Sequence, residues 1–283
     1  MGNEAVADFG EARRRLSRAT KHRNEMVEIH HQTPEGDALC AELVRSGDEV
    51  SIAITCAADP MLGTVFGEWL GAVRGVLDHV FYQLAIHETR QNPPTRKGDR
   101  QFPVCKTVEE FDALLVGRHR PMHGFSDAAV AAVRAMQPMN GKYGADGDAI
   151  LWLHDLARQD RHRVPWRMGG LIIDVRWEIR ESDLPGIVAH RKADLDEVAP
   201  VADADLAFVP VTFKCESEDA ARSLADGGIG VDVESRLELV DWFVHAHTSG
   251  ISANIRNDVL GDRMAFVEYF LGLVIDSFES MCA

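Results

Sequence analysis

Residues 62–86 read LGTVFGEWLGAVRGVLDHVFYQLAI, and this stretch decides most of what the sequence predicts. At about 100° per residue its apolar side chains fall on one face of an α-helix, which indicates a long helix packed on a core. That face is formed by Phe66, Val73, Leu77, Val80 and Leu84.

Four glycines lie on the opposite side of the same helix, each four residues after the last. A glycine inside a helix costs about 1 kcal/mol relative to alanine, so four in register need a compensating role. Glycine permits a close approach, here by another helix, a second subunit or a ligand. We therefore predict a close-packing ridge made of Gly63, Gly67, Gly71 and Gly75.

Polar side chains lie beside this ridge. Arg74 and His79 flank it, one on each side, and Asp78 and Tyr82 continue it. One interpretation is structural: Arg74 and Asp78 are four residues apart and form an ion pair, while His79 is an interface histidine with satisfied hydrogen bonds. The other interpretation is that the cluster is a functional site.

The segment from Arg74 to His79 resembles the R-x4-6-H motif of the HEPN superfamily, helical domains often found as metal-independent ribonucleases of toxin–antitoxin and antiviral systems. The resemblance implies that Arg74 binds phosphate, that His79 acts on the ribose 2′-hydroxyl or leaving oxygen, and that two copies meet in a homodimer. A forked guanidinium suits phosphate, and histidine titrates near neutral pH. Three other pairs have the same spacing but do not lie in a strongly amphipathic helix: Arg15–His22, Arg23–His30 and Arg118–His123.

A longer part of the chain is similar to a bacterial family of unknown function that carries GE…LRSALDH…QLA and DKHR-type segments. The matching segments are GEWLGAVRGVLDHVFYQLA, QFPV, QPM and LWLHDLARQDRHR, in that order. This similarity implies a shared architecture and no particular activity.

The remaining patterns predict an α+β fold, with a mainly helical core, a β-hairpin and a small C-terminal antiparallel sheet. The hairpin turns at Ser46-Gly47-Asp48, and Ser126 is expected to cap a helix. The predicted division is a helical core with the hairpin over residues 1–168 and a sheet with two helices over residues 169–283, which can also be one continuous domain. Helices are expected over residues 4–30, 126–136, 148–163, 235–246 and 262–281, and strands over residues 171–179, 206–215 and 229–233.

Asp160 continues the apolar face of the helix expected over residues 148–163. A carboxylate is costly to bury without a partner, so Asp160 is either paired or solvated at a frayed helix end. If it is buried, Arg74, His79 and Arg163 are the expected partners, and a contact with either of the first two would join two polar segments. Asp160 and His162 are expected to support the site at Arg74 and His79, as are Asp78 and Tyr82.

Charge and cysteine content narrow the class of protein. The net charge of −15 argues against broad nonspecific DNA binding, although residues 13–23 and 158–167 are basic and are candidate RNA contacts. The five cysteines form no CxxC pair, which predicts reduced thiols in a cytoplasmic protein without a disulfide-linked partner. No membrane span is expected, because charged residues interrupt the most apolar run, residues 264–278.

No cofactor or metal site is predicted, because the histidines lack an HExxH spacing. We therefore expect an HEPN-like RNA-binding protein or a metal-independent endoribonuclease, of the toxin or defence type. The alternative is a non-catalytic binding or oligomerisation module, in which the glycine ridge only packs.

Overall fold

The computed structural model describes most of the chain. The chain divides into two compact units, a helical unit (Met1–Met26, Thr64–Pro165 and Gly250–Ala283) and a sheet unit (Val27–Gly63 and Trp166–Ser249). The described residues are 6–32, 39–56, 58–116, 121–160, 166–179, 186–195, 200–201, 207–240, 242–243, 246 and 259–283.

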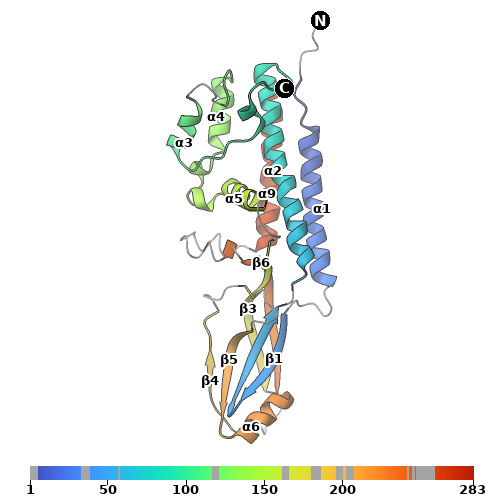
Figure 1. Ribbon diagram of the computed structural model, residues 1–283, viewed down its shortest axis with the longest axis vertical. Helices are drawn as coiled ribbons and strands as arrows, with labels where there is room; N and C mark the ends of the chain where they lie inside the picture. Colours follow the sequence, from blue (N-terminus) through green and yellow to red (C-terminus); the bar gives the residue numbers. More distant parts are fainter. Residues whose placement is uncertain are drawn as a thin grey trace. The chain divides into compact units, whose positions relative to one another are not determined.

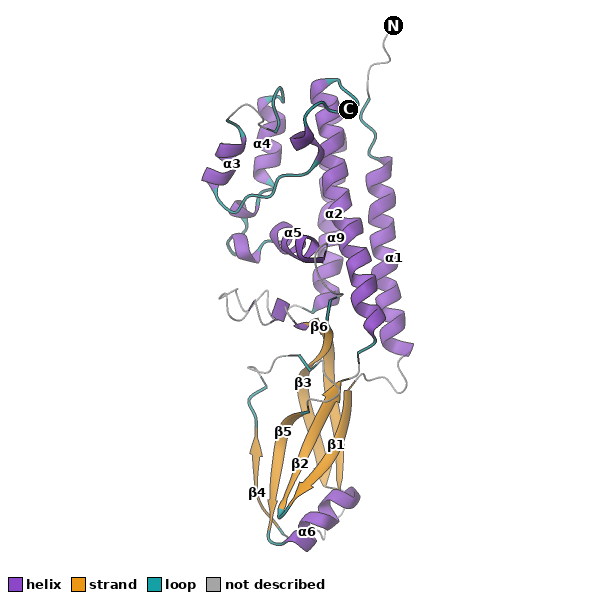
Figure 2. Ribbon diagram, in the orientation of Figure 1, coloured by secondary structure: helices purple, strands orange, loops and turns teal. Residues whose placement is uncertain are grey.

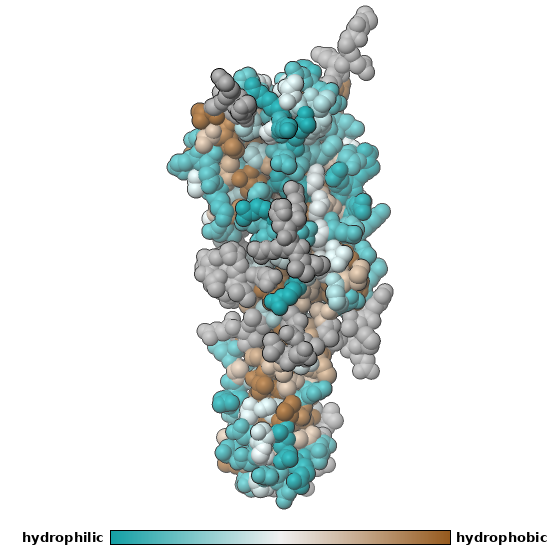
Figure 3. All heavy atoms as spheres, viewed as in Figure 1, coloured by the Kyte–Doolittle hydropathy of each residue, from teal (hydrophilic) through white to brown (hydrophobic). Residues whose placement is uncertain are grey.

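Three long helices form the body of the helical unit: α1 (Gly10–Gln32), α2 (Pro60–Thr89) and α9 (Leu260–Cys282) (Figure 1). Helix α1 packs with a narrow buried stripe that includes Ala12 and Ala19, both fully buried. Because the rest of α1 is strongly polar, hydrophilic residues dominate its side of the helical unit in Figure 3. The apolar stripe predicted for α2 is confirmed, since all five of its side chains are fully buried.

A buried carboxylate joins the three long helices. Glu268 of α9 is 7% exposed and accepts hydrogen bonds from Thr20 Oγ1 (2.9 Å) and Arg23 Nε (3.0 Å) of α1. Trp69 Nε1 of α2 donates a third bond at 2.9 Å. A buried charge is tolerated when it is paired and hydrogen-bonded, so this carboxylate fixes the helices relative to one another.

Shorter helices complete the helical unit: α3 (Val108–Leu114), α4 (Asp127–Ala135) and α5 (Ala149–Asp160). The prediction for Ser126 is confirmed, because its hydroxyl accepts the Ala129 N–H at the start of α4. Thr107 caps α3 in the same way, in a capping box with Glu110. Short 3₁₀ turns connect these helices: η2 (Lys97–Arg100), η3 (Pro138–Asn140) and η4 (Ala145–Gly147).

The sheet unit contains two antiparallel sheets over a shared core (Figure 2). The predicted hairpin is confirmed, and Gly47 turns it at φ +62°, a left-handed conformation that glycine adopts without strain. The four-stranded sheet has the order β1 (Leu39–Ser46), β2 (Glu49–Cys56), β5 (Phe208–Cys215), β4 (Ile187–Lys192). The second sheet pairs β3 (Met168–Ile179) with β6 (Ile229–Leu239), and α6 (Glu218–Ser223) and the π-helical turn η5 (Leu224–Gly228) precede β6.

The helix predicted over residues 235–246 is wrong at its start, because residues 235–239 extend β6. Ser235 pairs with Ile172 and Leu239 pairs with Met168, so β6 follows β3 along its full length. Pairing with a long neighbouring strand overrides a weak local helical pattern. Strand β4 and helices α3 and α6 were not predicted; each is short, and β4 lies at the edge of its sheet.

The two units differ from the predicted division at residue 168. The hairpin belongs to the sheet unit, because β2 pairs with β5 about 160 residues later, as in Val50 with Phe213. Helix α9 belongs to the helical unit, where Glu268 is bonded. The α+β class and the mainly helical core are as predicted.

Candidate functional site

The glycine ridge of α2 is approached closely at three of its four positions. A Cβ atom at Gly63 would lie 2.0 Å from the carbonyl oxygen of Trp166, and one at Gly67 would lie 2.8 Å from Asp160 Oδ1. At Gly75 the Cβ position is 2.6 Å from Arg15 Nη1. Gly71 is different, because no described atom lies within 4 Å of its Cβ position. The chain itself therefore uses three of the glycines and leaves one open.

Arg74 points away from α1 into a buried network. Its side chain is 8% exposed, and Nη2 donates to Asp78 Oδ1 at 2.7 Å and to the Phe102 carbonyl at 2.8 Å. Asp78 Oδ1 also accepts the Phe102 N–H at 3.0 Å, and Arg74 Nη1 lies 3.3 Å from His154 Nδ1 of α5. These bonds tie α2 to α5 and to the segment after η2. The guanidinium of Arg74 is thus occupied by the fold.

The pKa of His154 is lowered, first by burial and next by the positive charge of Arg74. Both effects favour the neutral imidazole. Neutral His154 can accept the Arg74 N–H at Nδ1 with its own proton on Nε2, which is consistent with the 3.3 Å separation. This pair is therefore a neutral histidine beside a structural arginine.

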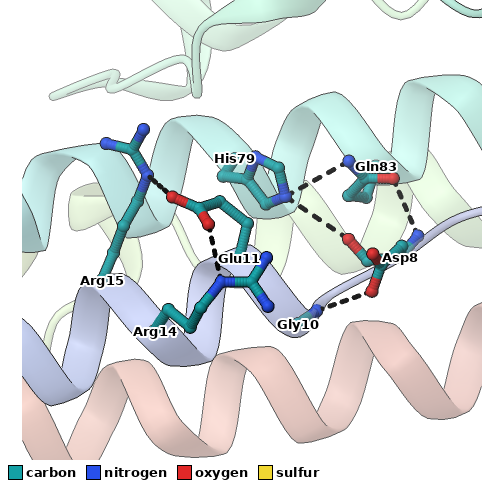
Figure 4. Close-up of polar contacts among 7 residues, drawn as sticks. All are labelled: Asp8, Gly10, Glu11, Arg14, Arg15, His79 and Gln83. Atoms are coloured by element: carbon teal, nitrogen blue, oxygen red, sulfur yellow. Dashed lines mark hydrogen bonds and ion pairs between the residues drawn. The ribbon is translucent and has the colours of Figure 1, made fainter.

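His79 lies on the other side of α2 and faces the start of α1 (Figure 4). Its Nε2 is 3.3 Å from the Asp8 carbonyl oxygen and 3.2 Å from Gln83 Nε2. Gln83 Oε1 accepts the Asp8 N–H at 2.9 Å, which fixes the orientation of its amide. The Asp8 side chain in turn accepts the Gly10 N–H at 2.8 Å, at the first residue of α1. Asp8 therefore connects the beginning of α1 to His79.

The two partners of His79 favour different tautomers. The Gln83 amide donates to an unprotonated Nε2 and leaves the proton on Nδ1, whereas the Asp8 carbonyl accepts from a protonated Nε2. In the second arrangement Nδ1 has a free lone pair and is able to accept a proton. His79 is half-buried and its ring stacks near Tyr82, whose hydroxyl donates to Asn92 at 3.3 Å.

The arginine beside His79 is Arg15 of α1. Its Nη1 lies over Gly75, one helical turn before His79 on the same face of α2. Glu11 joins it to a second arginine, because the Glu11 carboxylate is 3.2 Å from Arg15 Nε and 2.9 Å from Arg14 Nε (Figure 4). The hydrogen bond from Arg14 is the main cause of the lowered pKa of Glu11. On this side of α2, its histidine thus lies near a carboxylate and two guanidinium groups of α1.

An open groove continues from this cluster between α1 and α2. The hollow between the two helices has a volume of about 470 Å³, and it adjoins one of about 570 Å³ that is lined by α1 residues alone; we call the two together the α1–α2 groove. The helices run antiparallel here, since Asp8 contacts Gln83 at one end and His22 contacts Glu68 at the other. The residues lining the groove are Glu11, Arg14, Arg15, Ser17, Arg18, Lys21, His22 and Glu25 of α1 and Glu68, Gly71 and Ala72 of α2.

The charges of the α1–α2 groove are paired unevenly. Glu25 and Glu68 lie 3.3 Å and 3.4 Å from Nδ1 of His22, which is 8% exposed. Arg18 Nε donates to His22 Nε2 at 3.3 Å. No carboxylate among the described residues forms an ion pair with Arg18 or Lys21. Both cations are exposed and can meet an anion from solution.

The structure separates the residues that the sequence grouped together. Asp78 lies with Arg74, and Tyr82 lies near His79. Asp160 lies over Gly67, about 10 Å along α2 from Arg74, so within the described contacts it pairs with neither Arg74 nor His79. Residues 161–165 lie outside the described part, and they include His162.

Asp8, Glu11, Arg15 and Gln83 were missed by the sequence reasoning. Only the basic run at residues 13–23 signalled part of this group, because nothing in the sequence sets which face of α2 that run meets.

Other site types find no support in the described part of the chain. No group of histidine, cysteine and acidic residues there has the arrangement of a metal site, and all five cysteines are free thiols. None of its helices combines the length and the apolar character required to cross a membrane. Comparison with protein-family models, curated proteins and solved structures found no match.

Proposed function

We propose that this is an HEPN-like RNA-binding protein that contacts the sugar–phosphate backbone in the α1–α2 groove. The observation that carries the proposal is the placement of Arg14, Arg15, Arg18 and Lys21 along one groove, where Arg15 lies over Gly75, one helical turn from His79. Contacts between Lys or Arg and phosphates supply most of the affinity of proteins for nucleic acid. The net charge of −15 confines such binding to this local patch.

Metal-independent cleavage of the bound strand is the activity that His79 would supply. His79 Nδ1 takes the proton of the ribose 2′-hydroxyl, the 2′-oxygen bonds to phosphorus, and the bond from phosphorus to the 5′-oxygen breaks. The leaving oxygen takes a proton from water, which gives a 2′,3′-cyclic phosphate and a 5′-hydroxyl. This step uses the tautomer in which the Asp8 carbonyl accepts Nε2–H and orients the ring as Nδ1 gains its proton, so the Gln83 N–H has to move away from Nε2.

The phosphate-binding role that the motif assigns to Arg74 passes in this proposal to Arg15. Arg74 is held by three partners inside the helical unit, whereas the Arg15 guanidinium lies at the surface, one turn from His79. A planar guanidinium has donors to spare for a phosphate after its Nε bonds Glu11. Arg74 then has a structural role.

The test is binding and cleavage of labelled single-stranded RNA, with and without EDTA. We expect wild type to bind, His79→Ala to bind without cleaving, and Arg15→Ala to lose at least about tenfold in affinity. Arg13→Ala is the matched control, because Arg13 lies on the α9 side of α1 and pairs with Asp276 and Glu279.

Each outcome of this experiment has a distinct meaning. No binding by folded wild type refutes the proposal. Binding without cleavage retains the RNA-binding role and removes the ribonuclease activity. Cleavage that EDTA abolishes would point to a metal-dependent site and would contradict the chemistry proposed for His79.

The second candidate is a non-catalytic assembly module, most simply a homodimer. The observation that favours it is an exposed apolar stripe on α9, with Phe266 57%, Tyr269 66% and Leu273 49% exposed. Light scattering of wild type and of Phe266→Ser/Leu273→Ser distinguishes the two candidates. A dimer that dissociates in the variant, together with no affinity for RNA, would favour assembly over RNA binding.

A further inference from the structure

We propose that the α1–α2 groove is a track for single-stranded nucleic acid, with Arg14, Arg18 and Lys21 on three successive phosphates beyond the one held by Arg15 at His79. This inference rests on the proposed function and adds the form of the ligand, its footprint and its direction along α1. The strand runs from the His79 end of the groove toward His22.

The spacing of the three cations suits a strand lying along the helix. Arg14, Arg18 and Lys21 occupy positions i, i+4 and i+7 of α1 and therefore share one face. A rise of 1.5 Å per residue places them about 6 Å and about 4.5 Å apart along the axis. Flexible side chains at these steps can each reach a different phosphate of one extended strand.

The opposite wall of the groove leaves room for a backbone. Gly71 is exposed, lines the groove, and has no described atom within 4 Å of its Cβ position. Ala72 beside it adds only a methyl group. A sugar–phosphate chain can therefore approach α2 here, where a larger side chain would block it.

The groove does not suit a duplex. Its inner hollow lies between α1 and α2, and the axes of packed helices are typically about 8–10 Å apart. Modules that recognise double-stranded RNA by shape span about 16 base pairs and contact successive grooves. The cations here extend over only about 10 Å of α1, from residue 14 to residue 21.

Acidic groups limit the track at its far end. His22 is held between Glu25, which lines the hollow of Lys21, and Glu68, which lines the hollow of Arg15 and Gly71. Both carboxylates repel a phosphate close to His22. Glu11 lies between Arg14 and Arg15 and is already neutralised by both. The footprint is therefore four phosphates, one at His79 and three along α1.

The test measures binding by fluorescence anisotropy as a function of salt. Four phosphate contacts predict a slope of log K against log salt of about −3 for a single-stranded octanucleotide. Arg18→Ala/Lys21→Ala removes two contacts, so we expect a slope near −1.4 and at least about tenfold weaker binding. Arg13→Ala should leave the slope unchanged, because Arg13 lies outside the groove.

A second pair of variants changes shape without changing charge. Gly71→Leu fills the groove, whereas Gly71→Ala adds one methyl group to open space. Alanine and leucine both favour helix more than glycine does, so neither variant should unfold. We expect Gly71→Leu to bind the octanucleotide at least about tenfold more weakly and Gly71→Ala to bind within about threefold of wild type.

Ligand form supplies the remaining comparisons. We expect RNA and DNA octanucleotides to bind with similar affinity. A trinucleotide and a ten-base-pair RNA duplex should bind at least about tenfold more weakly than the octanucleotides, and inorganic tripolyphosphate should compete poorly with them. Equal affinity for the duplex, or strong competition by tripolyphosphate, overturns the track. If Arg15→Ala weakens RNA binding but Arg18→Ala/Lys21→Ala and Gly71→Leu change nothing, only this inference fails; if wild type binds no RNA, the proposed function fails with it.

Discussion

The two sides of α2 hold the two members of one sequence motif in different ways. Arg74 is 7% exposed and bonds three partners, at 2.7, 2.8 and 3.3 Å. His79 is half-buried, and its two hydrogen bonds are long, at 3.2 and 3.3 Å. Five residues correspond to about 500° of helix, so the two side chains diverge by about 140°. A short spacing on a helix therefore does not make two residues partners.

The difference also separates stability from binding. On the Arg74 side, removing the guanidinium leaves the Phe102 carbonyl without its Arg74 donor and the Asp78 carboxylate without its positively charged partner. On the His79 side, Glu11 and Arg15 line an open groove and can exchange one partner for another. Substitutions on the Arg74 side should therefore mainly lower the stability of the fold. Substitutions on the His79 side should mainly weaken RNA binding or cleavage.

The largest effect is expected at Arg74. Arg74→Ala should lower the free energy of unfolding by about 2–4 kcal/mol, because the Phe102 carbonyl loses its Arg74 donor and Asp78 loses its positively charged partner, keeping only the Phe102 N–H. His79→Ala should lower it by less than about 1 kcal/mol. Urea denaturation followed by circular dichroism measures both. An Arg74→Ala variant that is as stable as wild type but no longer cleaves RNA would return Arg74 to the catalytic role.

The glycine ridge offers a second contrast. Gly63→Ala should cost about 1–3 kcal/mol, since its Cβ would lie 2.0 Å from a backbone oxygen that cannot move freely. Gly71→Ala should instead stabilise the protein by about 1 kcal/mol. Thermal melts of the two variants should shift in opposite directions. A shift in the same direction would show that Gly71 is also packed.

The third prediction concerns pH and the pair of His154 with Arg74. The folded-state pKa of His154 is lowered, so the unfolded chain binds its proton first as the pH falls. The stability contributed by neutral His154 is present above its ordinary pKa, near 6.5, and is lost as the pH falls toward the lower folded value. Unfolding curves at pH 8 and pH 5.5 should differ less for His154→Gln than for wild type. An equal difference in the two proteins would contradict this assignment.

The smallest effect is expected at Glu11. Glu11→Gln removes the negative charge that Arg14 and Arg15 share, so both guanidinium groups become available to phosphate. We expect RNA affinity to rise by about threefold, with little change in stability. Anisotropy titrations against wild type at one salt concentration measure it. Weaker binding by Glu11→Gln would mean that Glu11 positions the arginines.

The fold was predictable where a pattern is local. The apolar stripe of α2, the turn at Gly47 and the cap at Ser126 each follow from a few neighbouring residues. Residues 235–239 were predicted as helix because only their pairing with β3, more than 60 residues earlier, makes them a strand. Long-range pairing of this kind leaves no periodic signal in a single sequence.

The sequence indicated which segments contribute to the candidate site, but it did not indicate which residues of those segments meet. The ridge and the basic run at residues 13–23 were both visible, but their meeting was not. Arg15 reaches Gly75 because α1 packs antiparallel to α2, and the burial of Ala12 and Ala19 sets that packing. Asp160 lies over Gly67, about two helical turns from Arg74 and more than three from His79, because the packing of α5 on α2 is likewise not set by a local pattern.

By itself, the sequence determined a long helix with an apolar face, a row of glycines, and polar groups on either side of them. These follow from the periodicity of the chain and from the free-energy cost of glycine in a helix. Only the tertiary structure decided that Arg74 is enclosed by α5 while His79 meets the basic face of α1. The physical reason is that the neighbours of a helix face are chosen by packing between distant segments, which no local pattern specifies.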